Sequence, residues 1–290
     1  MERNLQRLID TLVLERLDEN LFRGAVTDTH VRRVYGGKVL GEAINAAQST
    51  VEDERSVHSI HCYFLREADS KKPVIYEVDA SRDGGSFSAR RIVAIQNGRP
   101  IFTMEASFHK HEIGLKYHGA MPDAPPPEDV PKLSFKELDL TKAPPNVQRF
   151  VNISAPFEIR PIDHYTDEMP AGSEPTRRVW IRTVEPLPDD PAIHRAILAY
   201  ISDYGLITTL LMPHGIKITD TRLRMASLDH AMWFHRPFRM DEWLLYVCNG
   251  VSSAHSRGLA QGRFYRRNGE LVVSVVQEAL VQSQNFLLHL

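Results

Sequence analysis

The sequence has few cysteines, no excess of charge of either sign and no long uncharged apolar run. Its 290 residues include two cysteines, Cys62 and Cys248, which are too few for a disulfide framework or a cysteine-rich zinc site. The 35 basic and 37 acidic residues give a formal net charge of −2, which offers nucleic acid no overall electrostatic attraction. We therefore expect no nucleic-acid partner, no bound metal and no cofactor.

Signals for a membrane or for export are also missing. No segment approaches 18 apolar residues without a charge, and Met1 to Arg7 lack the apolar core of a signal peptide. This predicts a soluble intracellular protein that does not bind membranes. The last residues, Leu288-His289-Leu290, are similar to the peroxisomal signal Ser-Lys-Leu in having a basic residue before a final leucine. Leu288 replaces the small residue of that signal, so we expect a cytoplasmic or peroxisomal location.

The most informative segment that is present is strongly apolar and carries one carboxylate. From Ala192 to Met212, apolar residues occur nearly all round a helical wheel, which predicts a helix covered on most sides by protein. Asp203 lies near the middle of this segment. Because an ionised carboxylate is costly to bury without partners, we expect Asp203 either to be held by structural donors or to serve chemistry.

The chain repeats one order of elements on either side of residues 109–150, a break rich in proline and charge that we expect to contain no strand or helix. The first copy predicts a strand over 20–25, a helix over 38–49 and strands over 58–65, 74–80, 87–96 and 100–109. The second copy predicts a strand over 178–184, a helix over 192–212 and strands over 226–235, 243–249, 258–266 and 271–281. Asn97-Gly98 and Asn268-Gly269 occupy the same place in the two copies and are typical of hairpin turns.

This repeat predicts an α+β fold, a double hotdog in which two antiparallel sheets are each wrapped around a central helix. An enclosing sheet would explain why the helix over 192–212 is apolar on most faces. We expect an N-terminal hotdog over 1–110, a Pro-rich linker over 111–150 and a C-terminal hotdog over 151–290. Two hotdogs in one chain mimic the usual hotdog dimer, and we expect further assembly into a homo-oligomer.

Short motifs that are highly specific together extend over nearly the whole chain. They are Leu21-Phe22-Arg23-Gly24, Val34-Tyr35-Gly36-Gly37, His58 to Leu65, Asp83 to Arg90, Ile95 to Phe102, Leu228 to Pro237 and Val276-Gln277-Glu278. On these motifs the chain resembles acyl-CoA thioesterase II, the double-hotdog thioesterases of bacteria and of peroxisomes. The resemblance implies hydrolysis of a fatty acyl-CoA substrate to a free fatty acid and CoA.

The resemblance also implies three catalytic residues. The family has an Asp on the second central helix, a Ser or Thr on the next strand and a Gln on the last strand; the matching positions are Asp203, Ser227 and Gln277. Bacterial members have Thr where this chain has Ser227, which keeps the hydroxyl. Lys38 departs from the Gln that relatives commonly have after the double glycine, and this leaves substrate contacts near that helix start open.

Elementary chemistry agrees with these roles. A thioester carbonyl is reactive enough for direct attack by water, and Asp203 can accept the proton of that water as a general base. The Ser227 hydroxyl and the Gln277 amide offer both donors and acceptors to orient the water. Backbone N–H groups at a helix start are suitable donors for the oxyanion, and Gly36-Gly37 could let the thioester approach one closely.

Other interpretations remain open at this stage. Taken alone, Gln277 could be a sheet-edge residue, Ser227 an ordinary strand residue and Asp203 a structural carboxylate. Asp229-His230 suggests an acid–base pair, but adjacent strand residues point to opposite faces, so we expect His230 to be structural.

Other functions on the same fold are also open. They are a hotdog enoyl-CoA hydratase or dehydratase, for which His194 is the nearest histidine, and a non-catalytic acyl-CoA-binding module. A serine-hydrolase route is disfavoured because no Gly-x-Ser-x-Gly motif occurs. The first copy has only Glu42 as an acid on its helix, which we expect to lie in the first turn as a partner of the helix dipole. The sequence therefore predicts one catalytic centre per chain.

Overall fold

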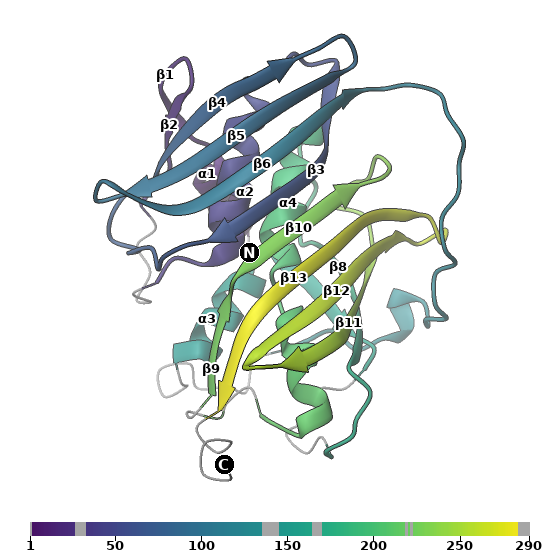
Figure 1. Ribbon diagram of the computed structural model, residues 1–290. Helices are drawn as coiled ribbons and strands as arrows, with labels where there is room; N and C mark the ends of the chain where they lie inside the picture. The colour runs from purple at the N-terminus through teal and green to yellow at the C-terminus, as the bar shows by residue number, and fades with distance from the viewer. Residues whose placement is uncertain are drawn as a thin grey trace.

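The computed structural model describes residues 2–26, 33–134, 145–163, 170–217, 220 and 223–283, and shows two units that share one plan (Figure 1). In the first unit, a curved antiparallel sheet covers the central helix α2 (Gly36–Gln48), and helix α1 (Glu2–Leu12) packs against α2. Its strands are β1 (Glu15–Asp18), β2 (Leu21–Arg23), β3 (Arg55–Phe64), β4 (Ile75–Asp83), β5 (Phe87–Gln96) and β6 (Arg99–Lys110).

The second unit repeats this plan around helix α4 (Pro191–Ser202), which is followed by the 3-10 helix η2 (Ile207–His214). Its strands are β7 (Phe157–Pro161), β8 (Thr176–Thr183), β9 (Leu223–Ser227), β10 (Asp229–Phe234), β11 (Leu244–Ala254), β12 (Arg257–Arg266) and β13 (Leu271–Ser283). The short 3-10 helix η1 (Pro127–Asp129) and helix α3 (Pro145–Ser154) lie between the two units in sequence. The predicted double hotdog is therefore the fold of this chain.

The sheets of the two units join edge to edge. In the part of the chain that the structure describes, one sheet runs in the order β1-β2-β4-β5-β6-β3-β10-β13-β12-β11-β8-β7, with β9 beside β13. Strand β3 of the first unit pairs antiparallel with β10 of the second, from Asp229 opposite Tyr63 to Trp233 opposite Ser59. Figure 1 shows the resulting surface as one continuous curved layer in front of the two central helices. The units thus share a core.

Helices α2 and α4 pack against each other unusually closely, because two glycines one helical turn apart face α4. A Cβ built at Gly41 would lie 2.9 Å from the carbonyl oxygen of Ala196, and one at Gly37 would overlap the carbonyl oxygen of Tyr200. The helices are antiparallel, since Gly37 meets Tyr200 and Gly41 meets Ala196. Any side chain at these two positions would push the helices apart.

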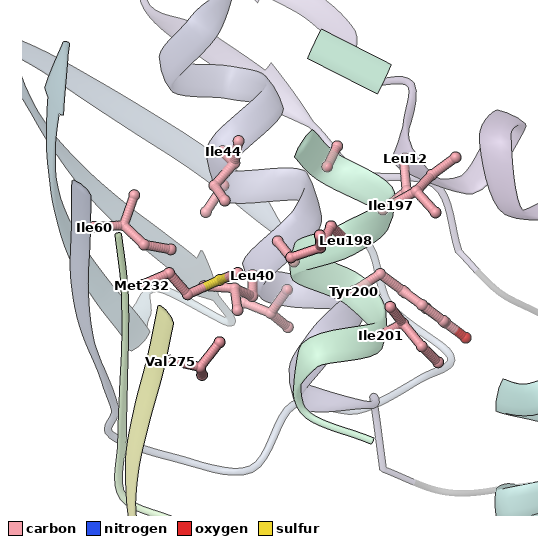
Figure 2. Packing of buried hydrophobic residues seen from close by; sticks show 14 of the residues in the cluster. Leu12, Leu40, Ile44, Ile60, Ile197, Leu198, Tyr200, Ile201, Met232 and Val275 are labelled. Atoms are coloured by element: carbon pink, nitrogen blue, oxygen red, sulfur yellow. The ribbon is translucent and has the colours of Figure 1, made fainter. Parts of the chain in front are cut away.

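Large apolar side chains fill the space between the helix pair and the sheet. Figure 2 shows Leu40 and Ile44 of α2 facing Ile60 of β3 and Met232 of β10, and all four are buried. Val275 of β13 completes this contact from the second unit. Strand residues alternate between this core and the outer face, which is the two-residue period read from the sequence.

The long helix expected over 192–212 is in fact two segments, and this prediction was wrong in detail. Helix α4 ends at Ser202, Asp203 is its C-cap with φ −75° and ψ −8°, and Gly205 has φ +72°. Left-handed backbone is easy for glycine and stops an α-helix, so Asp203 lies at the end of a helix rather than in its middle.

The α4–η2 segment is also the part of the described chain that could cross a membrane by length and composition alone. Its most apolar window, within Pro191–His214, is 67% buried inside the protein, as expected of a core helix. The apolar character of this segment is thus explained by its place under the sheet.

Two further element predictions were wrong. The strand expected over 226–235 is interrupted at Leu228 between β9 and β10, and α3 begins at Pro145, inside a region expected to contain no helix. Proline is tolerated at the first position of a helix because the N–H it lacks would have no helical partner there. The C-terminal residues Leu288-His289-Leu290 lie outside the described residues.

Candidate active site

Asp203 lies where the end of α4 meets the start of α2. Its Oδ2 accepts a hydrogen bond from the backbone N–H of Gly37 at 3.2 Å, and its side chain is partly exposed. A carboxylate at a helix N-terminus is stabilised by the unpaired N–H groups and by the helix dipole. The double glycine predicted to admit a substrate therefore also holds Asp203, and both units build this site.

Gln277 and Ser227 reach Asp203 from the sheet. Gln277 Nε2 donates to Asp203 Oδ1 at 2.8 Å and to Ser227 Oγ at 2.7 Å, while Ser227 Oγ donates to Asp203 Oδ1 at 3.2 Å. The structure thus brings the three residues named from the resemblance into direct contact. The Gln277 amide donates two hydrogen bonds, and the Ser227 hydroxyl donates one and accepts one. Together with Asp203 Oδ1 they form a closed triangle of hydrogen bonds.

The strand pattern explains why Gln277 points inward. It alternates on β13 with Val275 and Ala279, which also face the helices, and its own side chain is fully buried. Strand β13 has partners on both sides, β12 and the pair β9 and β10, so Gln277 is not the sheet-edge residue that was one reading of the sequence.

The interruption at Leu228 places Ser227. Strand β9 pairs with β13 through Ser227 opposite Ala279, whereas β10 pairs with it through Ala231 opposite Val276. The register shifts by one residue between these two ladders, and the carboxylate of Asp229 accepts the backbone N–H of Glu278 at 2.6 Å inside the break. The break therefore turns Ser227 toward Gln277, and Asp229 supports the backbone there.

His230 lies behind Gln277 in the core. It is fully buried, and its Nε2 lies 2.9 Å from Ser202 Oγ, the residue before Asp203. Burial lowers the pKa of His230 to about 4, and the nearby Gln277 side chain partly opposes that shift. The ring is consequently neutral near pH 7. Asp229 and His230 bind different groups and do not form an acid–base pair, as expected.

Other candidate groups have structural partners. His194 Nδ1 accepts the backbone N–H of Met240 at 2.9 Å, and burial lowers the pKa of His194. The Cys62 thiol donates to the carbonyl of His230, and burial, with the charges of Asp229 and Asp203, raises the pKa of Cys62 well above its usual value. A buried protonated thiol is a poor nucleophile, so Cys62 does not offer a covalent route.

Glu42 is not in the first turn of α2, and its expected role as a dipole partner was wrong. It lies in the second turn, fully buried, where Oε1 binds Lys38 Nζ at 2.9 Å and Oε2 accepts from Tyr76 at 2.7 Å. Burial raises the pKa of Glu42, with Lys38 and Tyr76 acting against it. The residue of α2 that corresponds to Asp203 is its C-cap, Ser49, which donates to Asn45.

The sequence did not reveal the part played by the Gly37 N–H or by His230. The four-residue spacing of Gly37 and Gly41 was a usable signal for two closely packed helices. The Asp229-His230 pair drew attention to His230 in the sequence, but its partners could not be found there, because they lie on α4 and β13. Among the described residues, no three His, Cys, Asp or Glu side chains are grouped so that they could hold a metal ion.

Comparisons with known proteins agree with this geometry. The family described as acyl-CoA thioesterase matches residues 154–280, and the acyl-CoA thioesterase N-terminal domain matches residues 26–109. The human acyl-coenzyme A thioesterase 8 is 38% identical over 95% of this chain and 89% of its own length. Acyl-CoA thioesterase 2 of Haemophilus influenzae is 35% identical over 96% of this chain and 98% of its own.

A solved structure shows the same relationship. The acyl-CoA thioesterase II of Mycobacterium marinum superposes with a TM-score of 0.79 at 37% identity and covers 96% of this chain and 99% of its own. Sequence likeness and fold likeness therefore extend over both units rather than over one of them. The chain belongs to the acyl-CoA thioesterase family.

Proposed function

We propose that this protein hydrolyses acyl-CoA thioesters to a free acid and CoA, with Asp203 as the general base. The observation that supports this most directly is the partly exposed Asp203 carboxylate, which is held by Gly37, Ser227 and Gln277 from three elements. A carboxylate fixed in this way is oriented before the substrate arrives, which is a main requirement for general-base catalysis.

Ser227 is the group best placed to bind the attacking water. Its hydroxyl accepts from Gln277 and donates to Asp203, so one lone pair of Oγ remains for a proton of that water. Asp203 takes the other proton as the water oxygen attacks the thioester carbon. The proton is then available to the departing CoA sulfur. Gln277 is fully buried, and it acts by holding the other two side chains.

The oxyanion lies at the start of α2 in this proposal. The first N–H groups of a helix have no partner within the helix, and they attract negative charge. Gly37 uses its N–H for Asp203, and the N–H groups of Lys38 and Val39 donate to the carbonyl of Tyr35, so the proposal assigns the developing oxyanion to the N–H of Gly36. The first unit therefore supplies donors and part of the substrate pocket, while the second supplies the base.

We further propose the division into an N-terminal hotdog over 1–110, a linker over 111–150 and a C-terminal hotdog over 151–290. The two family matches, over 26–109 and 154–280, support this division. One catalytic centre per chain follows from the helix ends, because the C-cap of α4 is Asp203 and that of α2 is Ser49.

The alternative of a hotdog hydratase or dehydratase is less well supported. His194 lies nine residues before Asp203 on α4, which is about 13 Å along a helix axis. Its Nδ1 is already bound to a backbone N–H, so it does not share a site with Asp203. Hydrolysis, unlike hydration or dehydration through His194, requires only Asp203 and the groups bound to it, which are Gly37, Ser227 and Gln277.

Release of free thiol from a panel of acyl-CoAs, from short to long chains, tests the function. Asp203→Asn keeps the shape of the side chain but cannot accept a proton, so kcat should fall by about 10²–10⁴-fold. Thermal unfolding shows whether the variant is folded. Near-wild-type turnover by a folded Asp203→Asn protein would remove Asp203 from the mechanism.

Ser227 offers a matched pair of variants for the same assay. Ser227→Thr keeps the hydroxyl and should retain most activity, whereas Ser227→Ala removes it and should lower kcat by at least about tenfold. Combining Ser227→Ala with Gln277→Ala should cost less than the product of the single losses, because residues that act as a unit are not additive. Multiplicative losses would argue that the two do not act on one water.

A further inference from the structure

His230 is a buried side chain that the proposed mechanism does not use, although it lies directly behind the site. It is fully buried on β10, and its Nε2 lies 2.9 Å from Ser202 Oγ at the end of α4. Tyr246 donates to the backbone carbonyl of the same Ser202 at 2.7 Å. His230 is thus anchored on one ring nitrogen to the helix end that carries Asp203.

The other ring nitrogen faces Gln277. The ladder of β10 and β13 ends at Ala231 opposite Val276, and His230 and Gln277 are the residues that follow this last pair on the two strands; both side chains are fully buried. Gln277 Nε2 uses both N–H groups on Asp203 and Ser227. Gln277 Oε1 and His230 Nδ1 are the polar atoms left over; both are buried, and neither has a hydrogen-bond partner among the described residues.

We propose that His230 is a positioning residue, which donates its Nδ1–H to Gln277 Oε1 and thereby fixes the Gln277 amide with its nitrogen toward Asp203 and Ser227. This inference rests on the proposed thioesterase function. It assigns a role within that site to a residue that does not touch the substrate.

Such a device is needed because the two ends of a glutamine amide are nearly identical in shape. If the Gln277 amide were rotated by half a turn, its oxygen would face the Asp203 carboxylate, and two acceptors would repel each other. The contact with Asp203 by itself already favours the observed orientation of the amide. A donor at Nδ1 of His230 favours the same orientation from the other end, because it pairs with the amide oxygen and would repel the amide nitrogen.

The protonation state of the ring is consistent with this arrangement. Burial lowers the pKa of His230 to about 4, so the ring carries one N–H near neutral pH, and Gln277 acts against that shift as an acceptor would. The Ser202 hydroxyl has one proton and two possible acceptors at 2.9 Å, Nε2 of His230 and the carbonyl of Ala199. With the imidazole proton on Nδ1, Nε2 is an acceptor, and the proposal assigns the Ser202 proton to it.

Two substitutions separate positioning from space filling. The amide of an Asn at position 230 lies about where Nδ1 of the histidine is, while the amide of a Gln extends to about where Nε2 is. His230→Asn can therefore still donate to Gln277, whereas His230→Gln keeps a partner for Ser202 and loses the one for Gln277. Both are neutral and both can form hydrogen bonds, so they are matched controls for each other.

Positioning predicts that His230→Asn retains kcat within about threefold of wild type, while His230→Gln loses about tenfold or more, with KM changing little in either. In a Gln277→Ala background, neither change at 230 should lower kcat further. A purely structural role predicts the reverse order, because Gln is closer to His in size. That reverse order, or equal kcat for both variants and wild type, would overturn the proposal.

A measurement on the wild-type protein covers the case in which a variant does not fold. Neutron diffraction locates the imidazole proton of His230, and the proposal requires it on Nδ1; a proton on Nε2 alone overturns it. The thioesterase function is tested separately by thiol release and Asp203→Asn. If the wild-type protein releases no thiol, the proposed function is wrong, while the neutron result still shows whether Nδ1 of His230 is a donor. If only the predicted order of kcat for His230→Asn and His230→Gln is wrong, the proposed function stands.

Discussion

Replacing Gly36 with alanine should lower catalysis much more than stability. Gly36 is the first residue of α2, and a Cβ built on it would lie 2.9 Å from Asp203 Oδ2 and 3.2 Å from a ring carbon of Phe64. Carbon atoms and their non-bonded neighbours prefer separations of about 3.5 Å or more. The Asp203 carboxylate must therefore move by roughly 0.5 Å, away from the N–H of Gly37 that binds it.

The size of the effect follows from what this displacement disturbs. The hydrogen bond from Gly37 to Asp203 is already long at 3.2 Å, and lengthening it further removes most of its strength. A misplacement of about 1 Å in an active site can cost about 100-fold, so we expect kcat to fall by about 10- to 100-fold. Helix propensity favours Ala over Gly by about 1 kcal/mol in a helix interior and by less at this first position, so it offsets part of the strain on the fold.

Two other glycines complete the experiment. Gly85 has no neighbouring atom within 4 Å of a built Cβ, so Gly85→Ala should behave as wild type. Gly37→Ala would overlap the Tyr200 carbonyl, a backbone atom that cannot turn aside, and should destabilise the protein by about 1–3 kcal/mol. Thiol release and urea unfolding are measured on all three variants. Wild-type kcat in a stable Gly36→Ala protein would refute the idea that the start of α2 holds Asp203.

Two predictions concern buried charge. Glu42→Gln leaves the buried Lys38 without its carboxylate, so the free energy of unfolding measured in urea should fall by about 3–5 kcal/mol. The kcat of the folded variant should stay within a few-fold of wild type. Unchanged stability would contradict a stabilising ion pair between Glu42 and Lys38. The second prediction concerns His230, which binds a proton near pH 6.5 when the protein is unfolded but only near its pKa of about 4 when it is buried. The free energy of unfolding of wild type should therefore fall by about 3 kcal/mol as the pH is lowered from about 6.5 to about 4. His230→Asn should lack this loss, and parallel stability curves for the two proteins would rule out a buried neutral ring.

Periodicity predicted the elements whose residues alternate cleanly between core and surface. The strand expected over 87–96 is β5 with the same bounds, and the helix expected over 38–49 is α2 within two residues. The turn at Asn97-Gly98 has φ +53° and +70° at these residues, as a tight hairpin turn requires. These features depend on each residue and its sequence neighbours, so one sequence is enough to find them.

The features that build the site depend on contacts between distant segments. An apolar pattern continued through Asp203 and outweighed the one local signal, Gly205, that α4 stops at Ser202. The break at Leu228 is fixed by β13 pairing with two strands in different registers. Ser227 and Gln277 were found through the family resemblance, because an isolated serine and an isolated glutamine in strands carry no chemical signature of their own.

The antiparallel helix pair explains why one carboxylate can serve at this place. The C-terminus of a helix is an unfavourable position for an anion, and Asp203 is the C-cap of α4. Because α2 runs in the opposite direction, its N-terminal N–H groups meet that carboxylate and reverse the sign of the local field. At the other end of the pair, the C-cap of α2 is Ser49, and Gln48 links to Arg195 of α4 instead. The repeat is therefore symmetric in its backbone and asymmetric in its charge, so, if Asp203 is the base as we propose, a second base would require an acid at position 49.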